Sequence, residues 1–165
     1  MKKRFETKTK NLKGLELKKY KSFKSINKNR FKHLLEDAFS KTLSKNYFNY
    51  VKPFRIILAK EGKNYLGGIV VERIDRNIYY LDKIAVIKER QRYGIGKKLW
   101  GALVSNHSKF VWRANNNNPI NDFYREHCDG MQKIEGWIIY WKGLNHDELE
   151  KGIGYAISKK KTMED

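Results

Sequence analysis

The stretch YYLDKIAVIKERQRYGIGKKLW, residues 79–100, changes its pattern at its glycines. Its first half is rich in Tyr, Leu, Ile and Val, which is typical of a β-strand. In its second half Ile95 and Leu99, followed by Leu103, recur at the spacing of one helical face. The stretch therefore predicts a strand, a glycine-rich turn and a helix that begins at the glycines.

The glycine-rich turn has the residue types of an anion-binding site. Glycines let successive backbone N–H groups point into one concavity, and the dipole of a helix that begins there adds positive potential. Lys97 and Lys98 follow directly and add charge. A Q-x-x-G-x-G pattern also occurs in ordinary turns, so alone it is weak evidence. The dinucleotide-binding pattern G-x-G-x-x-G and a Walker P-loop are both absent.

The elements around this stretch follow from the periodicity of the apolar residues. Between residues 30 and 48 these recur every three or four positions, which predicts one amphipathic helix. After Pro53, three runs rich in Ile, Val and Tyr are separated by turn signals and predict an antiparallel meander. A strand, a helix capped by Asn121 or Asp122, and a closing strand are expected further on, in KFVWRA, NDFYREH and GWIIYWKGL.

The length and composition exclude several classes of protein. A chain of 165 residues fits one domain. A single cysteine permits neither an intramolecular disulfide nor a cysteine-based zinc site, and we expect no metal cofactor. No apolar run approaches the roughly 20 residues that span a bilayer, so we expect no membrane association. The cytosol is the expected location, although the basic N-terminus leaves import into an organelle open.

The chain is strongly basic, with 36 Lys and Arg against 18 Asp and Glu and a net charge of +18. Such a charge attracts polyanions such as nucleic acids. The lysines, however, are scattered from one end of the chain to the other, which favours a solvated surface over a nucleic-acid-binding face. A nucleic-acid partner is therefore not expected.

Three segments together resemble the acetyltransferase domain of N-acetylglutamate synthase, in the branch where that domain follows an amino-acid-kinase domain: YYLDKIAVIKERQRYGIGKKLW, VWRANNNNPINDFY and CDGMQKIEGWIIYWKGL. The upstream AFSKTLSKNYF is similar to a helix of the same family. The resemblance implies the GNAT acyl-CoA N-acyltransferase fold, an α+β (α/β) architecture with a mixed, mostly antiparallel sheet flanked by helices. We expect a flexible basic N-terminus at 1–12, the acetyltransferase domain at 13–145 and a charged C-terminal tail at 146–165, which is frayed over 151–165.

The resemblance implies transfer of acetyl from acetyl-CoA to the α-amine of L-glutamate, by direct attack of the amine on the thioester, in arginine biosynthesis. The positions that match cations holding the glutamate carboxylates are Lys41, Lys83 and Arg113. Asn118 and Tyr124 match catalytic positions. An asparagine can orient substrate or water, and a tyrosine can protonate the departing thiolate as a general acid.

Two groups of residues are expected to hold acetyl-CoA. A backbone N–H of the third meander strand would donate to the thioester oxygen. The candidates on that strand are Ile84, Ala85 and Val86, and those of the pyrophosphate-binding turn are Gln91, Arg92, Tyr93, Gly94, Ile95, Gly96 and Lys97. The general base is left open between Glu126, His127 and a water chain, and Cys128 is expected to be a small buried residue.

The sequence departs from the family in two ways. Asn115 stands where the family has a second arginine, which leaves open another acceptor amine, such as a different amino acid, a polyamine or a protein lysine. The kinase-like domain that carries the arginine-binding regulatory site is missing, so a homodimer or a separate kinase-like partner chain is possible. A basic binding module without catalytic activity is the third alternative.

Overall fold

The computed structural model describes residues 12–165; the expected flexible N-terminus at 1–12 falls almost wholly outside them. The main elements, in chain order, are β1 (Glu16–Tyr20), α2 (Lys28–Phe39), β2 (Thr42–Leu43), α3 (Tyr47–Tyr50), β3 (Pro53–Glu61), β4 (Asn64–Asp75), β5 (Ile78–Val86), α4 (Ile95–Asn106), β6 (Phe110–Asn115), α5 (Asn121–His127), β7 (Gly130–Ile134), β8 (Trp137–Lys142), α6 (His146–Ser158) and β9 (Met163–Glu164).

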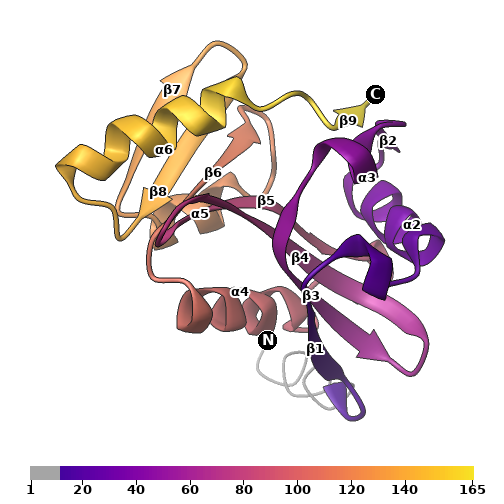
Figure 1. Cartoon of the computed structure of the whole chain (residues 1–165). Helices are drawn as coiled ribbons and strands as arrows, with labels where there is room; N and C mark the ends of the chain where they lie inside the picture. The colour runs from indigo at the N-terminus through magenta and orange to yellow at the C-terminus, as the bar shows by residue number, and fades with distance from the viewer. Residues whose placement is uncertain (1–11) are drawn as a thin grey trace.

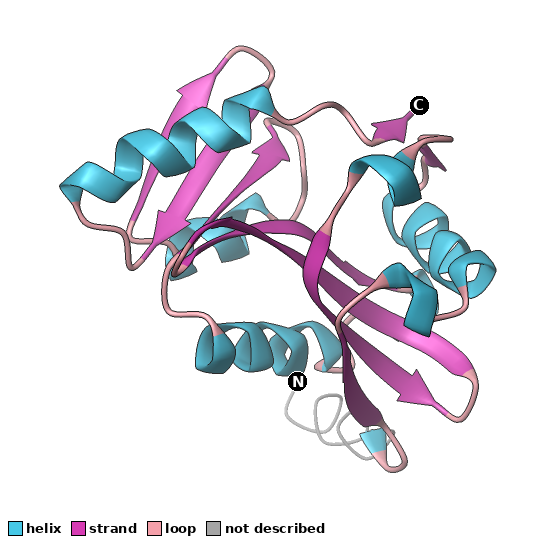
Figure 2. Ribbon diagram, in the orientation of Figure 1, coloured by secondary structure: helices cyan, strands magenta, loops and turns pink. Residues whose placement is uncertain are grey.

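Seven strands form one mixed sheet in the order β1-β3-β4-β5-β6-β8-β7 (Figure 2). Strands β5 and β6 pair in parallel, and all the other neighbours in this sheet are antiparallel. The expected meander is confirmed as β3, β4 and β5, and the expected helix at the glycines is confirmed as α4. A second sheet joins β2 to β9, close to the C-terminus.

Helices cover both faces of the large sheet (Figure 1). Both faces need cover because successive side chains of a strand point to opposite faces of the sheet, as β3 illustrates. Ile56 and Leu58 pack with α2 and α3, whereas Ile57 and Ala59 belong to the core beneath α4 and α5. Helix α6 packs through Ala156 against β6 and β8. The sheet is thus the middle layer between two sets of helices.

A glycine pair in β4 lets the helices approach the sheet closely. A Cβ atom on Gly67 would lie 3.0 Å from Cδ1 of Leu99 in α4, and one on Gly68 would lie 3.2 Å from a ring carbon of Phe31 in α2. Both separations are tighter than ordinary van der Waals contact, so larger residues would push the helices away. The two glycines therefore set the distance of α4 and α2 from the strands that carry the site.

The predicted helix over 30–48 is wrong in its second half. Helix α2 ends at Phe39 because Ser40 adopts a left-handed conformation with φ of 52°. Leu43 and Tyr47 are still buried beside α2, so the apolar spacing reflects one core that is shared by three elements, α2, β2 and α3. The cap predicted for α5 is also wrong: the N-cap is Ile120, without a side-chain hydrogen bond.

The C-terminal residues form regular structure, contrary to the frayed end expected at 151–165. Asn145 and Glu148 form a capping box that starts α6, and β9 then pairs with β2. Ala156 and Met163 are buried, which offsets the cost of ordering the segment. The charged residues around Ala156 and Met163 give the sequence no clear apolar pattern, so their burial was not predicted. No helix among residues 12–165 is long and apolar enough to cross a membrane.

Candidate functional site

The site lies where β5 and β6 separate. The two strands pair over only three residues, Tyr79–Leu81 with Phe110–Trp112. Beyond Leu81, β5 stays paired with β4 and β6 stays paired with β8, so the two strands diverge. The edge of β5 that would face β6 is therefore without a strand partner from Asp82 to Val86. The expected thioester-binding residues Ile84, Ala85 and Val86 lie on this edge.

A cavity of about 780 Å³ occupies the divergence of the strands. Its lining comes from β5, β6, the asparagine loop, the residues after α2 and the C-terminal segment. All five acceptor-binding and catalytic residues expected from the sequence line this one cavity: Lys41, Lys83, Arg113, Asn118 and Tyr124. Residues more than 80 positions apart in the chain are thus brought to one place.

Tyr124 lies on α5 beneath the cavity and is 6% exposed. Its ring packs edge-on to Trp112, with ring centres 5.5 Å apart, and against Tyr140 at 5.3 Å. Burial raises the pKa of Tyr124 well above its ordinary value, because the phenolate would be desolvated. The hydroxyl therefore keeps its proton at neutral and moderately alkaline pH.

The asparagine loop between β6 and α5 is held by its own side chains. Asn118 Oδ1 accepts a hydrogen bond from the Ile120 N–H at 3.1 Å, which closes a short turn beside the cavity. Asn121 is buried and donates to the backbone carbonyls of Asn115 and Asn116 at 2.9 and 3.1 Å. The asparagines therefore differ in role, since Asn121 fixes the loop and Asn118 lines the cavity.

A bulge in β5 places a buried ion pair at the wall of the cavity. The pairing of β4 with β5 steps from Val70–Lys83 to Val71–Leu81, which leaves Asp82 as the extra residue. The Lys83 ammonium lies 3.4 Å from the Asp82 carboxylate. Burial lowers the pKa of Lys83, and the nearby Asp82 carboxylate opposes that effect. The bulge thus sets a carboxylate and an ammonium side by side.

Each of the three expected carboxylate-binding cations has a partner in residues 156–165. The Lys83 Nζ donates to the Thr162 hydroxyl at 2.6 Å, and the Lys41 Nζ lies 3.2 Å from an Asp165 carboxylate oxygen. The Arg113 guanidinium donates to the backbone carbonyls of Ala156 and Lys160, both at 2.9 Å. It also lies 4.0 Å from the ring centre of Trp137. The C-terminal residues therefore contact all three of these cations.

The glycine turn lies at the start of α4 and only partly borders the cavity. Gln91 lines it and donates from its side chain to the Val86 carbonyl at 3.0 Å. Gly94 has φ of 89° and Arg92 has φ of 75°, both in the left-handed region. The remaining expected turn residues do not line the cavity, and the Ile95 side chain is fully buried in the core. Any anion contact of Ile95 would thus come from its backbone N–H at the helix start.

The residues left open as a general base lie away from the cavity lining. The His127 ring stacks on Phe123 at 4.0 Å, and its Nδ1 is 2.8 Å from the Phe123 carbonyl oxygen. Glu126 is exposed. Cys128 is half-buried, and burial raises the pKa of its thiol, which disfavours the thiolate.

Several lining residues have no predicted role from the sequence. Asp82 carried one signal, an acidic residue inside an apolar strand run. Lys161 and Thr162 carried none, because they lie in the part expected to be a loose tail. Among residues 12–165, no cluster of three or more His, Cys, Asp and Glu is arranged to hold a metal ion.

A family model described as NAT, the N-acetyltransferase of N-acetylglutamate synthase, matches residues 18–159. The chain belongs to this acetyltransferase family. The expected resemblance and the expected enzyme class, an N-acetyltransferase, are therefore confirmed.

Curated relatives of this acetyltransferase domain are longer proteins. An acetylglutamate kinase of Xylella fastidiosa is 28% identical over 145 residues, which cover 87% of this chain and 34% of that protein. The mitochondrial N-acetylglutamate synthase of Mus musculus is 34% identical over 121 residues, covering 73% and 23% of the two chains. The domain spans about a third or less of the relatives' length. A homodimer or a kinase-like partner stays a prediction, as does the cytosolic location.

Solved structures confirm the fold of the acetyltransferase domain. A GNAT family acetyltransferase of Elizabethkingia anophelis with acetyl-CoA bound has a TM-score of 0.55 and 18% identity, and the match covers 79% of this chain and 99% of that one. The ribosomal-protein-S18-alanine N-acetyltransferase of Escherichia coli has a TM-score of 0.61 and 14% identity, covering 77% and 93%. The GNAT fold with a mixed, mostly antiparallel sheet is thus as expected.

Proposed function

We propose that this acetyltransferase domain transfers the acetyl group of acetyl-CoA to the α-amine of L-glutamate. The observation that carries the proposal is the convergence of the cationic residues with Asn118 and Tyr124 in one cavity beside the unpaired edge of β5. Six cationic side chains line this cavity against two carboxylates, Asp82 and Asp165. Such an excess of positive charge favours an acceptor that carries carboxylates.

The chain offers a fitting place for acetyl-CoA. The unpaired edge of β5 presents backbone groups that can bond to an extended chain, as a neighbouring strand would. The first N–H groups of α4 have no partner within the helix and favour a phosphate group. Lys97 and Lys98 lie in the first turn of α4 and add positive charge there.

The geometry supports direct transfer. Acetyl-CoA supplies the activated acetyl group as a thioester. Tyr124 lines the cavity with its proton retained, so it can donate that proton to the sulfur that departs. Cys128 does not line the cavity, which argues against a covalent acyl-enzyme step on that residue.

Measuring turnover with acetyl-CoA across acceptors tests the proposal. L-Glutamate should be acetylated faster than neutral amino acids, polyamines or a lysine peptide, because only glutamate matches the cationic lining with two carboxylates. A preference for a polyamine or a lysine peptide would contradict the proposal. Polynucleotide binding that weakens steeply with salt, combined with no affinity for acetyl-CoA, would instead support a basic binding module.

Replacing Gly94 with alanine is expected to weaken acetyl-CoA binding about tenfold, since a side chain at φ of 89° costs about 1–2 kcal/mol and 1.4 kcal/mol is a factor of ten. The strained turn would relax and move the first N–H groups of α4. Isothermal titration with acetyl-CoA measures the change. Gly101→Ala is the matched control, because a Cβ there meets no atom within 4 Å. Equal affinity in both variants would show that the turn does not contact the ligand.

A further inference from the structure

The acceptor side of the cavity is the side lined by Lys41, Lys83 and Arg113. The C-terminal segment, residues 159–165, forms one wall of this side. Lys161 and Thr162 line the cavity directly. The segment is fixed at both ends, by a buried ion pair between Lys159 and Glu72 at 2.6 Å and by the pairing of β9 with β2. These two contacts hold the segment against the cavity.

Lys161 differs from Lys41, Lys83 and Arg113 because its ammonium group has no hydrogen-bond or ion-pair partner among residues 12–165. Lys41 and Lys83 pair with carboxylates, and the Arg113 guanidinium is bonded to backbone carbonyls. No hydrogen bond or ion pair joins Lys161 to any residue in the described part of the chain. Its charge is thus available to a ligand.

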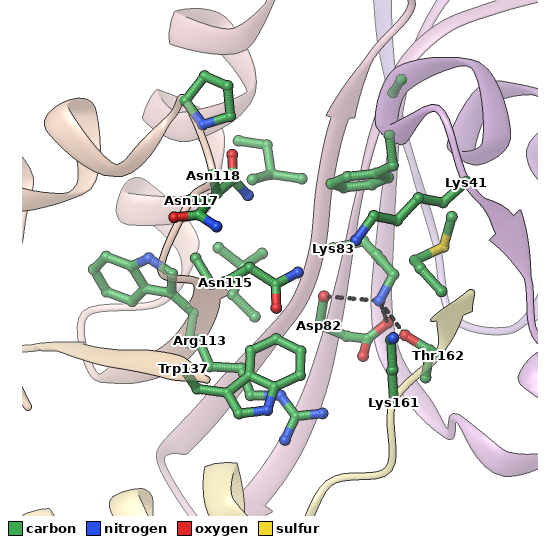
Figure 3. Close-up of a pocket in the computed structure, with 18 of the residues that line it drawn as sticks. Lys41, Asp82, Lys83, Arg113, Asn115, Asn117, Asn118, Trp137, Lys161 and Thr162 are labelled. Atoms are coloured by element: carbon green, nitrogen blue, oxygen red, sulfur yellow. Dashed lines mark hydrogen bonds and ion pairs between the residues drawn. The ribbon is translucent and has the colours of Figure 1, made fainter. Parts of the chain in front are cut away.

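Three lysine side chains point into the cavity from three separate elements (Figure 3). Lys41 comes from the residues after α2, Lys83 from β5 and Lys161 from the C-terminal segment. The amides of Asn115 and Asn118 lie across the cavity from them. Lys41 and Lys83 already pair with Asp165 and Asp82, so the charge that is left to attract a bound carboxylate is that of Lys161. The lysine side of the cavity is therefore suited to an acidic group and the amide side to a neutral polar one.

We infer that Lys161 binds a carboxylate of the acceptor, and that Arg113 is a positioning residue for the segment that carries it. This inference rests on the proposed function. Arg113 bonds to the carbonyls of Ala156 and Lys160, on the residues that lead into Lys161. Its guanidinium is thereby committed to the backbone, and the neighbouring Trp137 ring packs against it at 4.0 Å. Arg113 acts on the acceptor through the position of Lys161.

Lys161→Gln tests the first part of the inference. We expect the KM for L-glutamate to rise about tenfold, the effect of losing one charge-assisted hydrogen bond, while kcat and the affinity for acetyl-CoA stay nearly unchanged. Glutarate, a dicarboxylate without an amine, should lose affinity by the same factor in a direct titration. Lys161→Arg should retain most of the binding. Lys151→Gln, which removes an equal charge from the exposed face of α6, should leave both constants unchanged.

Arg113→Gln tests the second part through hydrogen exchange. Backbone amides of residues 159–163 should exchange faster in Arg113→Gln but not in Lys161→Gln, and both variants should bind glutarate more weakly. Unchanged glutarate affinity in Lys161→Gln, or no glutarate binding by the unaltered protein, would overturn the inference. Unchanged exchange in Arg113→Gln would overturn the positioning role. A failure of the unaltered protein to acetylate glutamate would instead count against the proposed function, and the glutarate titration would still report on Lys161.

Discussion

Replacing Tyr124 with phenylalanine is expected to lower kcat at least about 100-fold, the usual contribution of a positioned general acid. The change removes only the hydroxyl, so the ring still packs against Trp112 and Tyr140. The KM for acetyl-CoA should therefore stay nearly unchanged. Steady-state kinetics with saturating L-glutamate measure the effect.

The pH dependence of kcat gives an independent readout for Tyr124. A tyrosine donates its proton only below its pKa, and burial raises the pKa of Tyr124 above the ordinary value of 10.0. We therefore expect no loss of kcat from this residue as the pH rises to 10. Tyr79→Phe is the matched control, because Tyr79 packs on Phe54 and His107, away from the cavity. A kcat for Tyr124→Phe equal to that of the control would exclude the general-acid role.

Replacing Glu72 with glutamine is expected to lower the free energy of unfolding by about 3 kcal/mol, at the lower end of the range for breaking a buried ion pair. Glu72 is 3% exposed and Lys159 is 9% exposed, and their charged atoms lie 2.6 Å apart. Burial raises the pKa of Glu72, so this carboxylate depends on Lys159 to remain charged. The rings of Tyr50 and Tyr155, 4.5 and 5.5 Å from the Lys159 ammonium, retain part of its stabilisation.

Urea unfolding of Glu72→Gln measures this effect. The double variant Glu72→Gln with Lys159→Met should recover most of the loss, because it leaves no unpaired buried charge. The exposed pair of Asp75 and Lys151 is the matched control, and Lys151→Gln should cost less than about 1 kcal/mol. A loss in Glu72→Gln no larger than in Lys151→Gln would show that the buried pair does not anchor the C-terminal segment.

The central part of the fold was predictable because its signals are local. Each strand of the meander is rich in Ile, Val and Tyr and ends at a turn, and the glycines at the start of α4 come shortly after the third strand. The predicted helix is longer than α2 because Leu43 and Tyr47 keep the apolar spacing beyond Ser40, where the backbone turns. Spacing reports on burial, whereas the end of a helix depends on the conformation of one residue.

The members of the site could be named from the family resemblance, but their contacts could not. Arg113 was expected to face the acceptor, and its guanidinium is bonded to carbonyls more than 40 residues further along the chain. Thr162 and Lys159 lie in a charged segment, which predicted an exposed tail. Their polar groups bond to Lys83 and Glu72, which are distant in the sequence. Such pairs have no local signature in a sequence.

The pairing of β2 with β9 joins Thr42 to Glu164 and Leu43 to Met163, residues far apart in the chain. Because long-range pairing must first close a long loop, we expect it to form after the local meander and α4. Segments with few contacts also open first in the native state. Fraying of β9 would thus remove Lys161 and Thr162 from the cavity while leaving the glycine turn intact. With the role inferred for Lys161, the local stability of this short strand pair would govern affinity for the acceptor separately from affinity for acetyl-CoA.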